Sequence, residues 1–318
     1  MDKRTFEQAF NAVFHKKESF DDFLNIDLES ETTLLNIKDR IVIRQSDRLK
    51  KYLRFVDKVV LRYLARDEEV VHSFIKNKST LTAVKAHVDN KYFFLSDIRD
   101  FYKNIKNSDI LKILDRDKEL IPIEDFERYI RFLPSITTYR GSIPVGFSTS
   151  PQLSNAFLFD FDREMKKTCI ENSMVYSRYA DDIIISGNNL DEISELANQV
   201  QKKLHDFGSP NLFLKESKTR ITWKGNKVKI LGLVILPNGR ITIDKKYKIL
   251  IETLLHFYAT DSTQYQILLS KSLKNDEKSL FGLLHYANSV DPSYLEKLQR
   301  KYGALSLHTL MEEKEIEK

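Results

Sequence analysis

Two adjacent aspartates, Asp181 and Asp182, are the residues of this sequence with the clearest chemical potential. Neighbouring carboxylates repel each other and are costly unless cations or hydrogen-bond donors hold them. The flanking segments, 174–179 and 183–186, are rich in β-branched and aromatic residues, which predicts two strands joined by a tight turn. Because side chains alternate along a strand, a turn is what lets both carboxylates reach one volume. We therefore predict a hairpin over 174–186 with carboxylates at its tip.

A third aspartate, Asp97, closes an apolar run over 91–98 that predicts a buried strand. Carboxylates from two strand ends could hold two Mg²⁺ ions about 4 Å apart, the arrangement used for in-line phosphoryl transfer. One ion would activate an attacking hydroxyl, and the other would steady a triphosphate and its leaving pyrophosphate. The other adjacent pair, Asp21 and Asp22, has no apolar strand beside it, and we interpret it as a solvated turn.

The elements that must position these carboxylates are a mixture of helices and strands. Short strands are expected around 211–235, in addition to the strand and hairpin above. Helical spacing of apolar residues, with breaks at Gly and Pro, predicts helices over 49–64, 108–133, 150–168, 190–207 and from 245 onward, and short helices within 1–37. This mixed order indicates an α+β fold.

The composition excludes several classes of protein. An apolar content of 42% over 318 residues supports a sizeable core and excludes global disorder. The single cysteine, Cys169, excludes a disulfide framework and a cysteine-based zinc site. The N-terminus has no apolar core of a secretory signal, and no apolar run is long enough to cross a bilayer. We therefore expect a cytoplasmic protein without a membrane partner.

The net charge of +5 hides an uneven distribution along the chain. Residues 1–37 hold four basic residues against eight acidic ones, a net of −4. Residues 40–62 hold eight against two, a net of +6, and residues 215–248 hold ten against two, a net of +8. The two basic blocks could line a groove for a polyanion, and two solvated surfaces are the alternative interpretation.

The motifs around the carboxylates resemble those of a known family, the reverse transcriptases. Tyr179-Ala180-Asp181-Asp182 resembles the YxDD motif of that family. The segment that begins at Asp97-Ile98 and ends at Phe101-Tyr102 resembles the family's first metal motif. In the family an aromatic residue at the position of Tyr102 is a steric gate that excludes the ribose 2′-hydroxyl, which implies the use of dNTPs.

Three further motifs follow the family order. Ile143-Pro144-Val145-Gly146, with Ser150-Pro151 after it, resembles L/I-P-Q-G-x-x-x-S-P, except that Val145 replaces the usual Gln. Lys218 matches the lysine that follows the catalytic hairpin, where it would protonate or neutralise the leaving pyrophosphate. Leu231-Gly232 resembles the primer-grip hairpin. Single motifs of this kind are weak, but the ordered set over about 90–235 is specific.

The resemblance implies a right-hand polymerase that copies RNA into DNA. We expect an acidic N-terminal helical extension (1–37), fingers (38–96), a palm with an antiparallel sheet (97–240, with a fingers insertion at about 103–140) and a small helical thumb (241–318). The catalytic residues would be Asp97, Asp181 and Asp182, which with Ile98 would also hold two Mg²⁺ ions. Nucleotide-binding residues would be Phe101, Tyr102, Gly146, Lys218 and Arg40; the primer grip Leu231 and Gly232; and template-binding residues Arg44, Arg48, Lys51, Lys245 and Lys246.

Within the family the chain is most similar to bacterial retron reverse transcriptases, whose helical tail resembles 288–303 here. Two retron motifs, N-A-x-x-H and V-T-G, are matched only at His87 and Gly232. This resemblance implies that a structured non-coding RNA serves as template and primer, that the product is a branched RNA–DNA hybrid, and that an effector protein acts with the enzyme in anti-phage defence.

Two alternatives stay open. The chain could be a related phage-defence reverse transcriptase that makes DNA without a template or from a protein primer. It could also be a polymerase-shaped RNA-binding scaffold that holds an effector inactive. The intact set of three aspartates argues against the scaffold, because clustered like charges give a scaffold no advantage.

Overall fold

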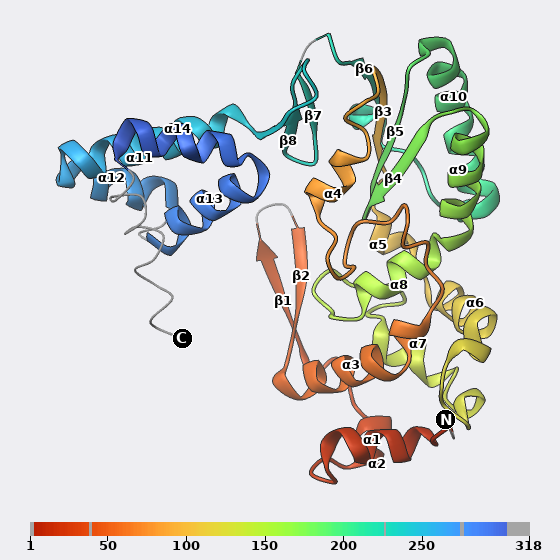
Figure 1. Cartoon of the computed structure of the whole chain (residues 1–318). Helices are drawn as coiled ribbons and strands as arrows, with labels where there is room; N and C mark the ends of the chain where they lie inside the picture. Colours follow the sequence, from red (N-terminus) through yellow and green to blue (C-terminus); the bar gives the residue numbers. More distant parts are fainter. Residues whose placement is uncertain (1–2, 38–39, 226, 274–276, 304–318) are drawn as a thin grey trace. The chain divides into compact units, whose positions relative to one another are not determined.

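A computed structural model describes residues 3–37, 40–225, 227–273 and 277–303 (Figure 1). By its contacts the chain divides into two compact units. The first contains residues 1–79 and 92–221, and the second contains residues 80–91 and 222–318. These units do not follow the domain bounds expected from the sequence, which stay a prediction.

The main sheet has the strand order β4-β5-β3-β6. Its strands are β3 (Tyr92–Asp97), β4 (Val175–Tyr179), β5 (Asp182–Gly187) and β6 (Arg220–Trp223). β5 pairs antiparallel with both β3 and β4. The strand predicted over 91–98 and the hairpin predicted over 174–186 are therefore confirmed.

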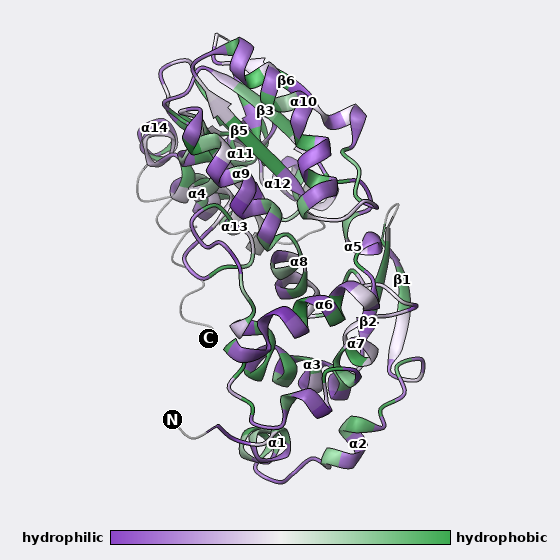
Figure 2. Ribbon diagram, turned by 90° about the vertical axis from the view of Figure 1, so that its right-hand side faces the viewer, coloured by the Kyte–Doolittle hydropathy of each residue, from purple (hydrophilic) through white to green (hydrophobic). Residues whose placement is uncertain are grey.

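The main sheet is covered by two helices of the first unit. The central residues of β3 and β5 are buried, which their near-continuous apolar sequences favour. α9 (Phe159–Glu171) contacts β4, and α10 (Leu190–Phe207) contacts β3 and β5. Figure 2 shows these strands coloured as hydrophobic and the two helices carrying hydrophilic residues. The sheet is thus a rigid base for the residues at its strand ends.

Aromatic side chains anchor the N-terminal helices to the rest of the first unit. α1 (Phe6–Phe14) and α2 (Phe20–Leu24) lie beside α3 (Asp47–Val59). The ring centroid of Phe10 is 5.2 Å from those of Phe23 and Phe55, within the range of favourable aromatic pairs. Residues 1–37, expected as an acidic extension, therefore contribute to the core of this unit.

A hairpin occupies residues 32–45. β1 (Thr32–Ile37) pairs antiparallel with β2 (Arg40–Gln45). The expectation of only short helices within 1–37 is therefore wrong for 32–37. The strand is stabilised by its partner across the hairpin, and such pairing is only weakly visible in local sequence preferences.

The remaining helices of the first unit partly follow the prediction. The helix expected over 49–64 ends at Val59 and continues as the 3-10 turn η1 (Leu61–Tyr63). The helix expected over 108–133 is interrupted around Pro122, a residue without a backbone N–H. From Phe101 to Phe157 the helical elements are α5 (Phe101–Asn104), α6 (Asn107–Asp117), η2 (Lys118–Leu120), η3 (Phe126–Arg128), α7 (Phe132–Thr137) and α8 (Ser150–Phe157).

The second unit combines a small sheet with helices. It contains α4 (Thr80–Lys85) and the sheet β7-β8-β9, with β7 (Val228–Ile230), β8 (Leu233–Ile235) and β9 (Ile241–Ile243). The predicted helical region is α11 (Lys245–Thr260), α12 (Ser262–Leu273), α13 (Glu277–Val290) and α14 (Pro292–Tyr302). The sequence predicts breaks near Asp261, Asp276 and Pro292. Asp261 separates α11 from α12 and Asp291 separates α13 from α14, which begins at Pro292, whereas Asp276 lies outside the described residues. Within the described ranges, no helix has the length and apolar character needed to cross a membrane.

A buried ion pair lies behind the β4–β5 turn. Arg178 of β4 and Asp162 of α9 are both fully buried. The guanidinium donates two parallel hydrogen bonds to the carboxylate, from Nε to Oδ1 at 2.8 Å and from Nη2 to Oδ2 at 2.6 Å. Tyr176 donates a third hydrogen bond to Asp162 at 2.7 Å. A bidentate pair with its remaining acceptor satisfied is the geometry in which a buried charge pair can be tolerated.

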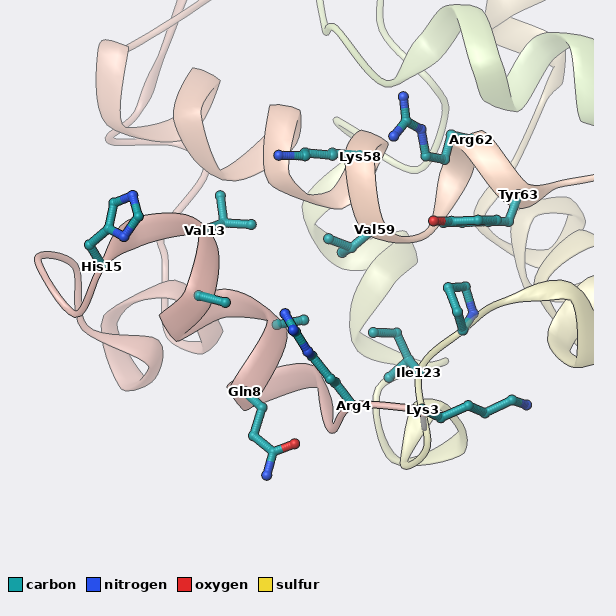
Figure 3. A pocket seen from close by; sticks show the side chains of 13 residues that line it. Lys3, Arg4, Gln8, Val13, His15, Lys58, Val59, Arg62, Tyr63 and Ile123 are labelled. Atoms are coloured by element: carbon teal, nitrogen blue, oxygen red, sulfur yellow. The ribbon is translucent and has the colours of Figure 1, made fainter. Parts of the chain in front are cut away.

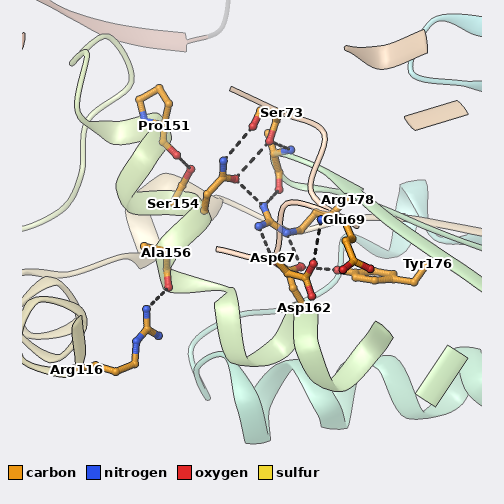
Figure 4. A network of polar contacts seen from close by, with 12 residues as sticks. Asp67, Glu69, Ser73, Arg116, Pro151, Ser154, Ala156, Asp162, Tyr176 and Arg178 are labelled. Carbon is orange, nitrogen blue, oxygen red and sulfur yellow. Dashed lines mark hydrogen bonds and ion pairs between the residues drawn. The ribbon is translucent and has the colours of Figure 1, made fainter. Parts of the chain in front are cut away.

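The same network extends to the turn and to α8 (Figure 4). Nη1 of Arg178 donates to the carbonyl oxygen of Ala180 at 2.8 Å and to Oδ1 of Asn155 at 3.3 Å. Asn155 donates to the carbonyl oxygen of Ser73 at 3.0 Å. The hydroxyl of Ser73 in turn accepts the backbone N–H of Ala180 at 2.9 Å. Both backbone polar groups of Ala180 are therefore held by buried side chains.

We expect Arg178→Leu to lower the free energy of unfolding by about 3–5 kcal/mol, because it leaves the Asp162 carboxylate buried without its partner. Urea unfolding followed by circular dichroism measures this loss. The matched control is Arg48→Leu, which removes an ion pair to Glu31 at the surface and should cost at most about 1 kcal/mol. Equal losses in the two variants would show that the buried pair has no special role.

Candidate active site

The strand register brings the three predicted carboxylates to one end of the main sheet. Asp97 is the last residue of β3 and Asp182 is the first residue of β5, and the two are directly paired. Asp181 lies in the turn before β5, and its carbonyl oxygen accepts the backbone N–H of Ile98 at 2.9 Å. Asp97 is buried, whereas Asp181 and Asp182 are half-buried. The two strand ends are therefore fixed to each other next to the carboxylates.

The turn that carries Asp181 has a demanding backbone conformation. Only two residues, Ala180 and Asp181, separate the paired residues Tyr179 and Asp182. Hairpin loops of two residues use turns with positive φ, which glycine adopts most readily. Ala180 has a φ of 56°, in the left-handed region. The hydrogen bonds from Arg178 and to Ser73 hold this residue in place.

The surroundings of Asp182 disfavour its charged form. Burial and the charges of Asp181 and Asp97 raise the pKa of Asp182 to about 6. Lys218, from the 3-10 turn η4 (Glu216–Lys218), forms an ion pair with Oδ2 of Asp97. The hydrogen bond to Asp97 raises the pKa of Lys218, so the lysine is held in its charged form. Lys218 thus lies beside Asp97, and its predicted role at the pyrophosphate stays a prediction.

The donor chemistry of the three aspartates fits a hard cation. Carboxylate oxygens are the ligands that Mg²⁺ prefers, and a divalent ion would offset the repulsion from Asp181 and Asp97, which adds to the effect of burial on the pKa of Asp182. As the side chains stand, no three His, Cys, Asp or Glu residues in the described part of the chain are grouped as a metal-ligand set. Asp97 instead binds Lys218. Metal binding would therefore compete with this ion pair.

Two aromatic residues, Phe101 and Tyr102, lie on α5, shortly after Asp97 in the sequence. Tyr102 is half-buried, and its hydroxyl hydrogen-bonds with Ser154 of α8. Burial raises the pKa of Tyr102, with a smaller contribution from the charge of Asp181, so the phenol lies within electrostatic reach of the turn. Phe101 is buried, with its ring centroid 6.5 Å from that of Phe157. Tyr102 is thus near the carboxylates, whereas Phe101 belongs to the core beneath them.

Gly146 lies against the β1–β2 hairpin. Its φ is 119°, and a Cβ at this position would lie 2.2 Å from the carbonyl oxygen of Ile43 in β2. The Ile43 N–H donates to the carbonyl oxygen of Val145 at 2.8 Å, and Gln45 donates its side-chain amide to that of Gly146. Only glycine permits this approach of two backbones. A nucleotide-binding role of Gly146 stays a prediction.

The predicted template-binding residues of the first unit are exposed on β2 and α3. Arg44 lies on β2, opposite Thr33. Arg48 pairs with Glu31 at 2.9 Å, and Lys51 pairs with Glu18 at 3.1 Å. These acidic partners come from the first 37 residues, so part of the negative charge counted there neutralises the basic block. The side chain of Arg40 lies outside the described residues.

The other predicted residues belong to the second unit. Leu231 and Gly232 form the two-residue turn between β7 and β8, and both have positive φ, 51° and 82°. Lys245 and Lys246 are exposed in the first turn of α11. The primer-grip and template-binding roles of these residues stay predictions.

The residues that position the turn were not predicted from the sequence. Arg178, Asp162, Asn155 and Ser73 come from segments that are up to 105 residues apart, and no local spacing connects them. One signal was available. An arginine in the middle of the apolar strand predicted over 174–186 must be paired if that strand is buried.

Comparisons with known proteins agree with this geometry. The family model "Reverse transcriptase (RNA-dependent DNA polymerase)" matches residues 37–235. The retron Ec83 reverse transcriptase of Escherichia coli is 24% identical over 277 residues, covering 85% of each chain. The retron Ec73 reverse transcriptase of Escherichia coli is 28% identical over 242 residues, covering 73% of each chain.

The fold has a solved counterpart as well. The structure of apo telomerase from Candida tropicalis matches with a TM-score of 0.50 and 12% identity, covering 85% of this chain. The match spans 58% of the telomerase chain, a little over half of its length. This likeness supports the right-hand polymerase fold that the motifs predicted. The carboxylates at one end of the sheet and the match over 37–235 agree: the chain belongs to the reverse transcriptase family of RNA-dependent DNA polymerases, as a retron-type member.

Proposed function

We propose that the chain copies a structured non-coding RNA into DNA, with two Mg²⁺ ions held by Asp97, Asp181 and Asp182. Reverse transcriptases use divalent metal ions, and the identity and number of the ions are part of the proposal. The observation that carries it is the register of the main sheet, which pairs Asp97 with Asp182 and places Asp181 in the turn beside them. Two ions would activate the primer hydroxyl and neutralise the triphosphate.

The residues of the chain have distinct roles in this proposal. The three carboxylates, with the backbone of Ile98, hold and orient the ions. Lys218 carries its proton next to Asp97, where it can protonate or neutralise the leaving pyrophosphate. Tyr102 places its ring close to Asp181 and excludes the 2′-hydroxyl of a ribonucleotide. Its hydrogen bond to Ser154 fixes the ring for this role.

The retron-specific part of the proposal rests on the relatives rather than on the site. The RNA would serve as template and would also provide the 2′-hydroxyl primer, which gives a branched RNA–DNA product. The primer-grip turn Leu231-Gly232 and the exposed Lys245 and Lys246 would contact the nucleic acid, and the helices α11 to α14 would recognise the RNA by shape. The proposal also includes a cytoplasmic location, an effector protein as partner and a role in anti-phage defence.

Replacing Asp181 and Asp182 by Asn should abolish DNA synthesis, because each change removes a charged metal ligand. Metal ions contribute several kcal/mol to the stabilisation of such transition states, so we expect a fall of about a thousandfold or more. Incorporation of labelled dNTPs measures this, and Mg²⁺ binding by calorimetry should weaken in parallel. The matched control is Asp21→Asn with Asp22→Asn, an exposed pair in the first turn of α2.

Unaltered synthesis in the Asp181 and Asp182 variant would refute the metal assignment. If synthesis stops while phage protection persists in cells, the protein acts as a scaffold and not through its product.

Replacing Tyr102 by Ala should increase the incorporation of ribonucleotides relative to deoxyribonucleotides, because space opens for the 2′-hydroxyl. The measurement is the ratio of kcat/KM for a dNTP and the matching rNTP. Tyr102→Phe is the control, since it keeps the ring and loses only the hydroxyl that bonds with Ser154. A ratio unchanged in the Ala variant would refute the gate.

Sequencing the nucleic acid that co-purifies with the protein tests the template. We expect one RNA species joined to DNA complementary to part of it, with a branch that resists exonucleases. Homopolymeric or random DNA would instead indicate template-independent synthesis, and DNA linked covalently to protein would indicate a protein primer.

A further inference from the structure

A basic pocket lies at the N-terminal end of the first unit, on elements other than those that carry the catalytic carboxylates. Its volume is about 950 Å³, and its lining comes from the N-terminal segment, α1, the end of α3, η1 and the segment around Ile123 (Figure 3). Four cationic side chains line it: Lys3, Arg4, Lys58 and Arg62. Alanine, valine, isoleucine and proline side chains form its apolar part, together with Tyr63. A concave site of this size is large enough for a nucleotide.

The charge of this pocket is not compensated. No acidic residue lines it, and the structure gives none of the four cations an ion pair within the residues it describes. Asp57 lies within electrostatic reach of Arg62 but does not line the pocket. Two other cations of the same basic block, Arg48 and Lys51, do have acidic partners. Concave sites lined by one sign of charge concentrate ligands of the opposite sign.

The backbone around the pocket is well anchored. The carbonyl oxygen of Arg4 accepts the N–H of Glu124 at 2.9 Å, and the N–H of Phe6 donates to the carboxylate of Asp125 at 2.7 Å. The ring centroid of Phe6 is 5.3 Å from that of Phe55, which joins α1 to α3. The cations therefore project from a packed framework.

The lining also selects the chemistry of the ligand. Lysine and arginine side chains only donate hydrogen bonds, so the pocket offers many donors and few acceptors. An RNA strand presents acceptors along its whole phosphate backbone, whereas a peptide also carries N–H donors that need acceptors. Tyr63 is 40% exposed and can stack an unpaired base. We propose that this pocket binds an unpaired segment of RNA, with a base against Tyr63 and the neighbouring phosphates on the four cations.

This proposal rests on the proposed function, since it supposes that a structured RNA with single-stranded segments is bound by the protein. It assigns that RNA a second contact, separate from the carboxylates. It also assigns a role to Lys3 and Arg4, which lie in a segment of negative net charge. A second contact of this kind would hold the RNA while its template segment moves during synthesis.

The test uses the full chain, a labelled oligouridine of about ten nucleotides and an excess of unlabelled primer–template duplex. Fluorescence anisotropy measures the Kd of the oligonucleotide as a function of salt. For Lys58→Ala with Arg62→Ala we expect the Kd to rise about tenfold and the salt slope to fall by about 1.4, since two phosphate contacts are lost. The matched control is Lys112→Ala with Arg128→Ala, which removes two exposed cations that do not line the pocket.

A second variant tests the stacking. Tyr63→Ala should raise the Kd about tenfold with an unchanged salt slope, and Tyr63→Phe should bind as the unchanged protein does. Equal Kd values for the pocket variant and the control variant would overturn the proposal. So would stronger competition by an acidic peptide than by unlabelled oligouridine, which would identify a peptide site. DNA synthesis on an added primer–template should be unaffected in all of these variants, and its absence from the unchanged protein would refute the proposed function instead.

Discussion

The buried ion pair between Arg178 and Asp162 is the interaction on which the geometry of the site depends. The residue before Asp181, Ala180, has a positive φ in the two-residue turn that joins Tyr179 to Asp182. Alanine does not favour this conformation, and its backbone is held by hydrogen bonds to side chains. Arg178 supplies one of these bonds, and it can do so only because Asp162 compensates its charge in the interior. The position of α9, which carries Asp162, therefore influences the conformation of the turn at the end of β4.

Charge is arranged in opposite ways on the two sides of this turn. On the buried side, the positive charge of Arg178 is matched by Asp162, so the interior is neutral. On the other side, Asp97, Asp181 and Asp182 lie at the strand ends and in the turn, and Lys218 forms an ion pair with Asp97. Burial is the largest cause of the raised pKa of Asp182, and the charges of Asp181 and Asp97 add to it. A site with surplus negative charge of this kind attracts divalent cations, and Lys218 can shield Asp97 when cations are not bound.

The sequence predicted those features that depend on local patterns. Alternating and apolar runs located the β4–β5 hairpin and β3, and a motif singled out Lys218, which the structure places next to Asp97. The sequence did not predict the β1–β2 hairpin or the contact of Gly146 with Ile43, because both depend on partners that local preferences do not identify. The network around Arg178 joins α8, α9, β4 and the segment at Ser73, and only the folded chain brings these segments together.

In the folded molecule, the basic residues of the chain differ in whether they have acidic partners. Part of the acidic charge of the first 37 positions is neutralised, because Glu31 and Glu18 pair with cations of the basic block that follows. This pairing divides the block into cations with acidic partners on the first part of α3 and cations without ion pairs in the pocket at its end. Polyanion binding depends on the cations that can exchange counterions for phosphates, and not on the charge summed over a segment. A count along the sequence includes Arg48 and Lys51 on the same terms as Lys58 and omits Lys3 and Arg4, whereas the folded chain separates the cations that have acidic partners from those that line the pocket.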